Sequence, residues 1–261
     1  ILLIINITYT IITYIGVDFM AYDGIVTKSI IAELKNTIIN GKINKVFEPN
    51  KNEIILGIYS SGKNYALNIC IESSNCRIHL TTHSKPNPHN ALNFCMLLRK
   101  HLSSARIGSI SQPGLERVVE FELEHLNELG DPCKKYLIVE LMGKYSNIIF
   151  CDENRMILDS IKHVSSHMSS IREVLPGRDY FLPQTQEKYD PLTITEEDFR
   201  NAVCKKPCNI AKAIYTTLTG ISPLIAEEIC YRASIDGNDA AQSLDENASV
   251  HLYHTFKRLI E

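Results

Sequence analysis

Alternation of apolar and charged residues constrains the fold of this chain more than any other feature of its sequence. Between residues 118 and 126, Val119, Phe121 and Leu123 alternate with three glutamates. Successive side chains of a β-strand point to opposite faces, so this pattern predicts a strand with one buried face and one acidic face. The same alternation recurs over residues 65–71.

The predicted strands belong to an α+β domain. Strands are expected at residues 43–48, 53–59, 65–71, 77–82, 118–126, 134–142, 147–151 and 156–163. Apolar residues spaced three or four apart predict amphipathic helices at 23–39 and 92–102. We therefore predict antiparallel strands with two helices over residues 20–185, followed by a small all-helical domain over residues 186–261.

The helical part contains a candidate helix–hairpin–helix. Gly220 lies in a tight turn between helices expected at 209–218 and 223–231, and Pro223 occupies the first turn of the second helix. Backbone N–H groups at such a turn can bind a phosphate, which makes Gly220 a candidate phosphate contact. A simple helical corner is the alternative interpretation.

The composition suits a globular protein without cofactors. Apolar residues make up 44% of the 261 residues, enough to bury a core without disulfides or metals. The eight cysteines are scattered, and the close pair Cys204 and Cys208 lacks the second pair that a zinc site needs. We expect reduced thiols, no metal, no cofactor and, in the absence of a nucleophile elbow or Walker-type loop, no enzymatic activity. The net charge of −3 counts mildly against nucleic-acid binding but leaves room for a local basic face.

The first nineteen residues are apolar, rich in β-branched side chains and free of lysine and arginine. They suit neither a signal peptide, which needs a basic start, nor a membrane anchor with basic flanks. We interpret residues 1–19 as a translated leader or non-native extension, with the protein beginning at Met20, and expect no membrane partner.

Three short segments carry candidate RNA-binding residues. Arg99 and Lys100 are adjacent cations near a helix end, which can hold an RNA backbone or simply face water. Glu116 and Arg117 lie where a strand begins, and such a pair can read a base edge. On these residues alone an ordinary surface ion pair is favoured. Lys144, in a turn between two strands, is a further candidate phosphate contact or part of a plain hairpin loop.

Taken together, six motifs in order resemble the NFACT family, which includes bacterial RqcH and eukaryotic NEMF proteins. The motifs are Met20–Gly24, Gly41–Pro49, Phe94–His101, Gln112–Arg117, Val139–Gly143 with Ser146–Ile149, and Leu175–Gly177. The resemblance runs from Met20 to the end of the chain. It implies a first domain similar to the N-terminal domain of formamidopyrimidine-DNA glycosylases, then a helix–hairpin–helix portion, with a coiled coil beyond residue 261.

The resemblance also implies a function in ribosome-associated quality control. Family members bind tRNA in the cytoplasm on large ribosomal subunits that hold a stalled peptidyl-tRNA, and support untemplated C-terminal tailing of the nascent chain. By position, the implied tRNA contacts fall on Asp23, Glu116 and Arg117, with Arg99 and Lys100 nearby. Two departures from the family pattern stand out: Glu116 replaces the usual aspartate, and Lys144 with Tyr145 replaces Arg and His.

Two other functions are weaker alternatives. Bacterial members of the family are often labelled fibronectin- or fibrinogen-binding proteins, but an adhesin would be expected to carry a signal peptide. A DNA glycosylase of the similar fold needs an N-terminal proline followed by an acid, whereas Ala21 and Tyr22 follow Met20 here.

Overall fold

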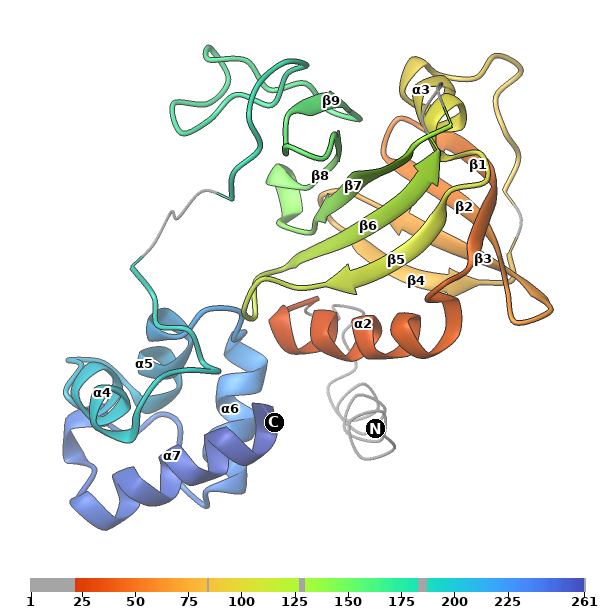
Figure 1. The fold of residues 1–261 in the computed structure, drawn as a ribbon. Coiled ribbons are helices and arrows are strands. Elements are labelled where there is room, and N and C mark those ends of the chain that lie inside the picture. Colours follow the sequence, from red (N-terminus) through yellow and green to blue (C-terminus); the bar gives the residue numbers. More distant parts are fainter. Residues whose placement is uncertain (1–21, 84, 127–129, 183–186, 261) are drawn as a thin grey trace. The chain divides into compact units, whose positions relative to one another are not determined.

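The computed structural model describes residues 22–83, 85–126, 130–182 and 187–260 (Figure 1). The chain forms two compact units. Of the residues that the structure describes, those within 30–112 and 118–182 form the sheet unit, and those within 22–29, 113–117 and 187–260 form the helical unit. The helical unit thus includes two segments that precede the predicted domain boundary at residue 185. The predicted leader, residues 1–19, lies outside the described residues.

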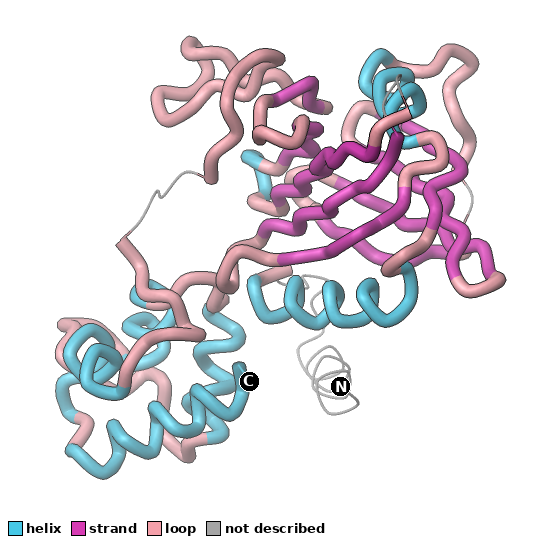
Figure 2. The backbone as a smooth tube through the Cα atoms, in the orientation of Figure 1, coloured by secondary structure: helices cyan, strands magenta, loops and turns pink. Residues whose placement is uncertain are grey.

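An antiparallel sheet forms the sheet unit, with strand order β4-β3-β2-β1-β5-β6-β7-β8-β9 among the described residues. The strands, drawn in magenta in Figure 2, are β1 (Lys42–Asn50), β2 (Glu53–Ser60), β3 (Lys63–Cys70), β4 (Arg77–Thr81), β5 (Arg106–Ser111), β6 (Val118–Leu126), β7 (Pro132–Glu140), β8 (Asn147–Cys151) and β9 (Ile157–Ser160). A short 3-10 turn, η1 (Gly143–Tyr145), joins β7 to β8. The mixed fold with an antiparallel sheet and helices in the C-terminal region confirms the predicted fold class.

Strand β6 shows why the alternation was informative. Phe121 and Leu123 are each 1% exposed, while the glutamates that alternate with them, Glu120, Glu122 and Glu124, are more exposed. Two of those carboxylates are paired: Glu122 Oε1 lies 2.9 Å from Lys134 Nζ, and Glu120 Oε1 lies 3.0 Å from Arg155 Nη1. Basic residues on neighbouring segments therefore neutralise much of the acidic face.

Helix α3 (Asn93–Leu102) packs on β1 and is capped by it. Its N-cap residue makes no side-chain hydrogen bond, but the Cys95 N–H donates to Glu48 Oε2 at 2.9 Å. A carboxylate at a helix N-terminus meets the positive end of the dipole. Burial raises the pKa of Glu48, an effect that the Cys95 hydrogen bond opposes. The buried side of α3 is formed by Phe94, Cys95, Leu98 and Leu102.

Capping residues define the helices of the helical unit, drawn in cyan in Figure 2. Its elements after residue 184 are α4 (Glu196–Phe199), η2 (Arg200–Cys204), α5 (Ile210–Thr217), α6 (Pro223–Arg232), η3 (Ala241–Ser243) and α7 (Glu246–Ile260). The side chains of Thr195, Asn209 and Ser222 accept from backbone N–H groups of the helices that they precede.

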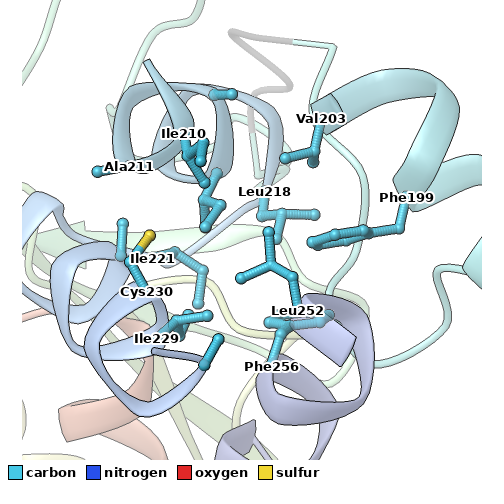
Figure 3. Packing of buried hydrophobic residues seen from close by; sticks show 14 of the residues in the cluster. Phe199, Val203, Ile210, Ala211, Leu218, Ile221, Ile229, Cys230, Leu252 and Phe256 are labelled. Carbon is cyan, nitrogen blue, oxygen red and sulfur yellow. The ribbon is translucent and has the colours of Figure 1, made fainter. Parts of the chain in front are cut away.

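A continuous apolar core fills the helical unit (Figure 3). The rings of Phe199 and Phe256 stack with their centroids 5.3 Å apart, and Leu252 is fully buried beside them. Ile25 and Leu115 belong to the same core although both come from the first half of the chain. Burial of Leu115 explains why residues 113–117 join the helical unit.

Two further observations concern membrane-spanning helices and the cysteine thiols. Within the ranges that the structure describes, no helix has the length and apolar character needed to cross a bilayer. All eight cysteines are free thiols, and burial raises the pKa of Cys151 to about 12 and of Cys230 to about 11.

Candidate nucleic-acid interface

Three backbone segments meet at the carbonyl group of Leu115. A Cβ atom on Gly24 would lie 2.0 Å from the Leu115 oxygen, and one on Gly220 would lie 1.9 Å from it. The Gly24 N–H donates to the Gly220 carbonyl at 2.9 Å. Gly220 also has a φ of +71°, which favours glycine. The start of helix α2 (Gly24–Ile38), the turn before β6 and the α5–α6 turn are therefore in direct contact, and glycine permits it.

Asp23 ties two of these segments together. Its Oδ1 accepts the N–H groups of Ile25 at 3.1 Å and Val26 at 3.0 Å, which caps α2. Its Oδ2 accepts from the Ser222 hydroxyl at 2.6 Å, and Ser222 in turn caps α6. Burial raises the pKa of Asp23, and the hydrogen bonds from Ser222 and the backbone oppose that rise. With 5% of its surface exposed, Asp23 joins the first residues of α2 to Ser222 and presents almost no surface to a partner.

Asp23→Ala is expected to lower the free energy of unfolding by about 1–3 kcal/mol, because it removes a helix cap and a buried acceptor. Asp23→Asn keeps an oxygen that can accept from the backbone N–H groups of α2, so it should lower the free energy of unfolding less than Asp23→Ala does. The pKa of Asp23 is higher in the folded state, so the folded chain binds more protons and the Asp23 contribution weakens as pH rises from its unfolded pKa to its folded pKa. Urea unfolding of the wild type and Asp23→Asn at several pH values tests this: a wild-type advantage that grows with pH would contradict it.

Glu116 and Arg117 follow directly after buried Leu115. The Glu116 N–H donates to the Pro113 carbonyl at 2.9 Å, which closes a turn, and Arg117 is exposed. Burial raises the pKa of Glu116, while the positive charges of Arg117 and Lys188 oppose that rise. The turn therefore places an exposed guanidinium beside a half-buried carboxylate.

Two lysines that the sequence did not single out join this pair. Lys188 Nζ donates to the Tyr215 carbonyl at 3.0 Å, and Lys206 Nζ donates to the hydroxyls of Thr216 at 3.0 Å and Thr217 at 2.9 Å. Burial lowers the pKa of Lys188, the charge of Glu116 opposes this, and the charges of Lys206 and Arg117 lower the pKa further.

We call Glu116, Arg117, Lys188, Asp190 and Lys206 the Lys188 cluster. Lys188 and Asp190 reach it because their segment pairs with the end of α5. Tyr189 N–H donates to the Thr217 carbonyl at 2.9 Å, and Thr219 N–H donates to the Tyr189 carbonyl at 3.0 Å. Asp190 raises the pKa of Glu116, so the cluster holds two carboxylates and three cations.

The other predicted contacts belong to the sheet unit. Arg99 Nε donates to the Val46 carbonyl at 2.9 Å, and both Arg99 and Lys100 are exposed at the end of α3. Lys144 lies in η1 with its Nζ 4.8 Å from the centre of the Tyr145 ring. Asp23, Glu116, Arg117 and Gly220 thus belong to the helical unit, and Arg99, Lys100 and Lys144 belong to the sheet unit.

Residues 23–261 match the family described as NFACT N-terminal and middle domains. The chain belongs to this family. It is 39% identical to the Rqc2 homolog RqcH of Bacillus subtilis over 217 residues, 83% of this chain and 38% of that protein. It is 30% identical to the archaeal Rqc2 homolog of Methanocaldococcus jannaschii over 241 residues, 89% of this chain and 34% of that protein. The chain therefore spans less than half the length of these NFACT relatives.

Solved structures of proteins about 30% identical to this chain share its fold. The N-terminal part of a fibronectin/fibrinogen-binding protein from Streptococcus suis aligns with a TM-score of 0.77 at 30% identity, covering 90% of this chain and 84% of that one. A fibrinogen binding protein from Staphylococcus aureus aligns with a TM-score of 0.76 at 32% identity, covering 92% and 81%. The family recognised from the sequence motifs is confirmed.

Proposed function

We propose that this NFACT chain is the N-terminal part of a cytoplasmic ribosome-associated quality-control factor, and that its helical unit binds tRNA through the Lys188 cluster. The full factor would act on large ribosomal subunits that hold a stalled peptidyl-tRNA and would support untemplated C-terminal tailing of the nascent chain. The relatives support the role in ribosome-associated quality control. They are named Rqc2 homologs in bacteria and archaea and a ribosome quality control complex subunit in human. The proposal gives the chain a binding role and no catalytic residue.

The observation that carries the tRNA assignment is the gathering of Arg117 and Lys188 beside the half-buried carboxylate of Glu116, with Lys206 beside Lys188. Arg117 is exposed and offers a planar fork that suits a phosphate or a base edge. Lys188 and Lys206 are held by a backbone carbonyl and by hydroxyls, so their ammonium groups lose little freedom when they bind a phosphate. Glu116 can accept hydrogen bonds from the amino group of an unpaired base.

Asp23 and Gly220 have supporting roles in this proposal. Asp23 is buried and fixes the starts of α2 and α6, and Gly220 leaves room for the Leu115 carbonyl. Both therefore position the turn that carries Glu116 and Arg117. We propose Arg99, Lys100 and Lys144 as additional contacts from the sheet unit, each with RNA phosphate.

The double substitution Glu116→Ala with Arg117→Ala tests the proposal. Both side chains lie in a surface turn whose fold depends on Leu115, so the melting temperature should stay unchanged. Recovery of tRNA with the purified protein should fall by about tenfold or more. Lys212→Ala, which removes an exposed cation of α5 in the same unit, is the matched control and should leave recovery intact. Equal tRNA recovery from the double variant and the wild type would exclude this site.

Lys188→Ala and Lys206→Ala test the new members of the cluster. Each removes one cation that we assign to phosphate, so tRNA affinity should weaken, and the slope of log affinity against log salt should shrink by about one for each lysine removed. Titrations of labelled tRNA between 50 mM and 200 mM salt measure the slope. An unchanged slope in both variants would place these lysines outside the interface.

A fibronectin- or fibrinogen-binding adhesin is the second candidate function, because solved relatives carry those names. Binding of the chain to immobilised fibronectin or fibrinogen, together with no recovery of tRNA, would favour it over the proposed function.

A further inference from the structure

A second basic site lies in the sheet unit, in a cavity of about 460 Å³ between β1 and α3. Its lining residues are Ile43, Asn44, Lys45, Val46, Phe47, Arg99 and Ser103. This volume falls within the range of small-molecule sites in proteins. The wall combines two cations, one aromatic ring, two neutral polar side chains and no carboxylate.

The cavity exists because β1 has a strand partner along the whole of one edge but only along the start of the other. It pairs with β2 from Lys42 to Asn50, but with β5 only through Lys42 and Arg106. Beyond that point α3 takes the place of a strand among the described residues. The Val46 carbonyl accepts from Arg99 Nε at 2.9 Å and from the Cys95 thiol at 3.6 Å.

A β-bulge shapes the wall of the cavity. The register of β1 against β2 shifts between Ile43 and Lys45, which makes Asn44 the extra residue. Gly57 on β2 accommodates it, since a Cβ there would lie 2.9 Å from Asn44 Oδ1 and 3.1 Å from Lys45 Cβ. Bulges redirect side chains, and this one places Asn44 and Lys45 beside the cavity.

The charge of the cavity selects an anion. Lys45 and Arg99 are exposed, and Arg99 is oriented by its bond to the Val46 carbonyl. The nearest carboxylate on β1, that of Glu48, is 5% exposed and engaged with the N-terminus of α3. A cavity of similar volume in the helical unit, about 500 Å³, differs in this respect, because Glu227 and Asp236 line it beside Lys212. Those carboxylates would repel a phosphate.

We propose that the β1–α3 cavity binds one nucleotide of single-stranded RNA. Lys45 and Arg99 would contact its phosphate, and Phe47 would pack against its base. Asn44 and Ser103 would supply hydrogen bonds to the base or ribose. The inference rests on the proposed function in that RNA is the partner, but it depends on residues of the sheet unit alone.

The experiment titrates the full chain with a labelled RNA tetranucleotide and follows fluorescence polarisation. Lys45→Ala and Arg99→Gln should each weaken binding by about tenfold. Lys212→Ala, which removes the cation of the acidic cavity, should leave binding unchanged. Competition by unlabelled adenosine monophosphate, adenosine and inorganic phosphate distinguishes the contribution of the base to binding from that of the phosphate. Adenosine monophosphate should compete best, and Phe47→Leu should reduce its advantage over phosphate.

Wild-type affinity in both Lys45→Ala and Arg99→Gln would overturn the inference, and so would phosphate competing as well as the nucleotide. The outcome can be separated from that of the proposed function by testing Glu116→Ala with Arg117→Ala in parallel. That double variant should lose tRNA and keep the tetranucleotide. If the double variant still binds tRNA while Lys45→Ala no longer binds the tetranucleotide, the tRNA assignment of the Lys188 cluster is wrong and the nucleotide site in the β1–α3 cavity is supported.

Discussion

Gly220→Ala is expected to lower the free energy of unfolding of the helical unit by about 2–5 kcal/mol. Alanine at a φ of +71° costs about 1–2 kcal/mol by itself. The new Cβ would also lie 1.9 Å from the Leu115 carbonyl oxygen, a backbone atom that cannot rotate away. Relief of this overlap requires Leu115 to move, and its side chain is fully buried in the core of the unit.

Gly62→Ala is the matched control for this prediction. Gly62 has a φ of +79° and no atom within 4 Å of its Cβ position, so only the backbone cost of about 1–2 kcal/mol applies. Urea unfolding of both variants gives the two costs. If they are equal, the contact between Gly220 and Leu115 contributes nothing. Gly220→Ala should also weaken tRNA binding under conditions where the variant remains folded, because Leu115 precedes Glu116 and Arg117 directly.

Local patterns in the sequence predicted most of the elements. The alternation of Phe121 and Leu123 with glutamates predicted β6, since burial on one face of a strand is a property of that strand alone. The apolar spacing predicted a helix at 23–39, and Asp23 caps α2 at that point through two hydrogen bonds from backbone N–H groups. Pro223 likewise begins a helix where expected. The start of a helix depends on residues that are close together in the sequence, and for this reason the sequence alone can predict it.

The site was less predictable, because it depends on contacts between distant segments. The apolar character of Leu115 predicts that its side chain is buried. The residues next to it in the sequence do not predict that it joins the core of the helical unit. Lys188 lies in a stretch without periodicity, and its place in the cluster follows from the pairing of Tyr189 with Leu218. The residues themselves made Glu116 and Arg117 candidates, and the family resemblance favoured them as tRNA contacts. The structure adds Lys188 and Lys206 to the same cluster.

The second large effect concerns Glu140, a fully buried carboxylate at the end of β7. Its Oε1 accepts from the Tyr180 hydroxyl at 3.0 Å, and its Oε2 pairs with the Arg172 guanidinium. Arg172 also donates to the Phe181 carbonyl at 2.6 Å. Charges placed out of water are costly unless paired, so Glu140 depends on Arg172 for its compensation. The pair also fastens residues 172–181, which contain little regular structure, to the sheet unit.

Arg172→Met is therefore expected to lower the free energy of unfolding by about 3–5 kcal/mol, since it leaves a buried carboxylate unpaired. Arg178→Met is the control in the same segment. Its partner is Glu173 at 2.8 Å, but 61% of the Arg178 side chain is exposed, so the expected cost is about 1 kcal/mol or less. Adding Glu140→Gln to Arg172→Met removes the unpaired charge and should restore part of the lost free energy of unfolding. Thermal and urea unfolding of the four proteins measure these differences. Equal losses in the two arginine variants, or no recovery in the double variant, would show that the charge of Glu140 is compensated by other groups.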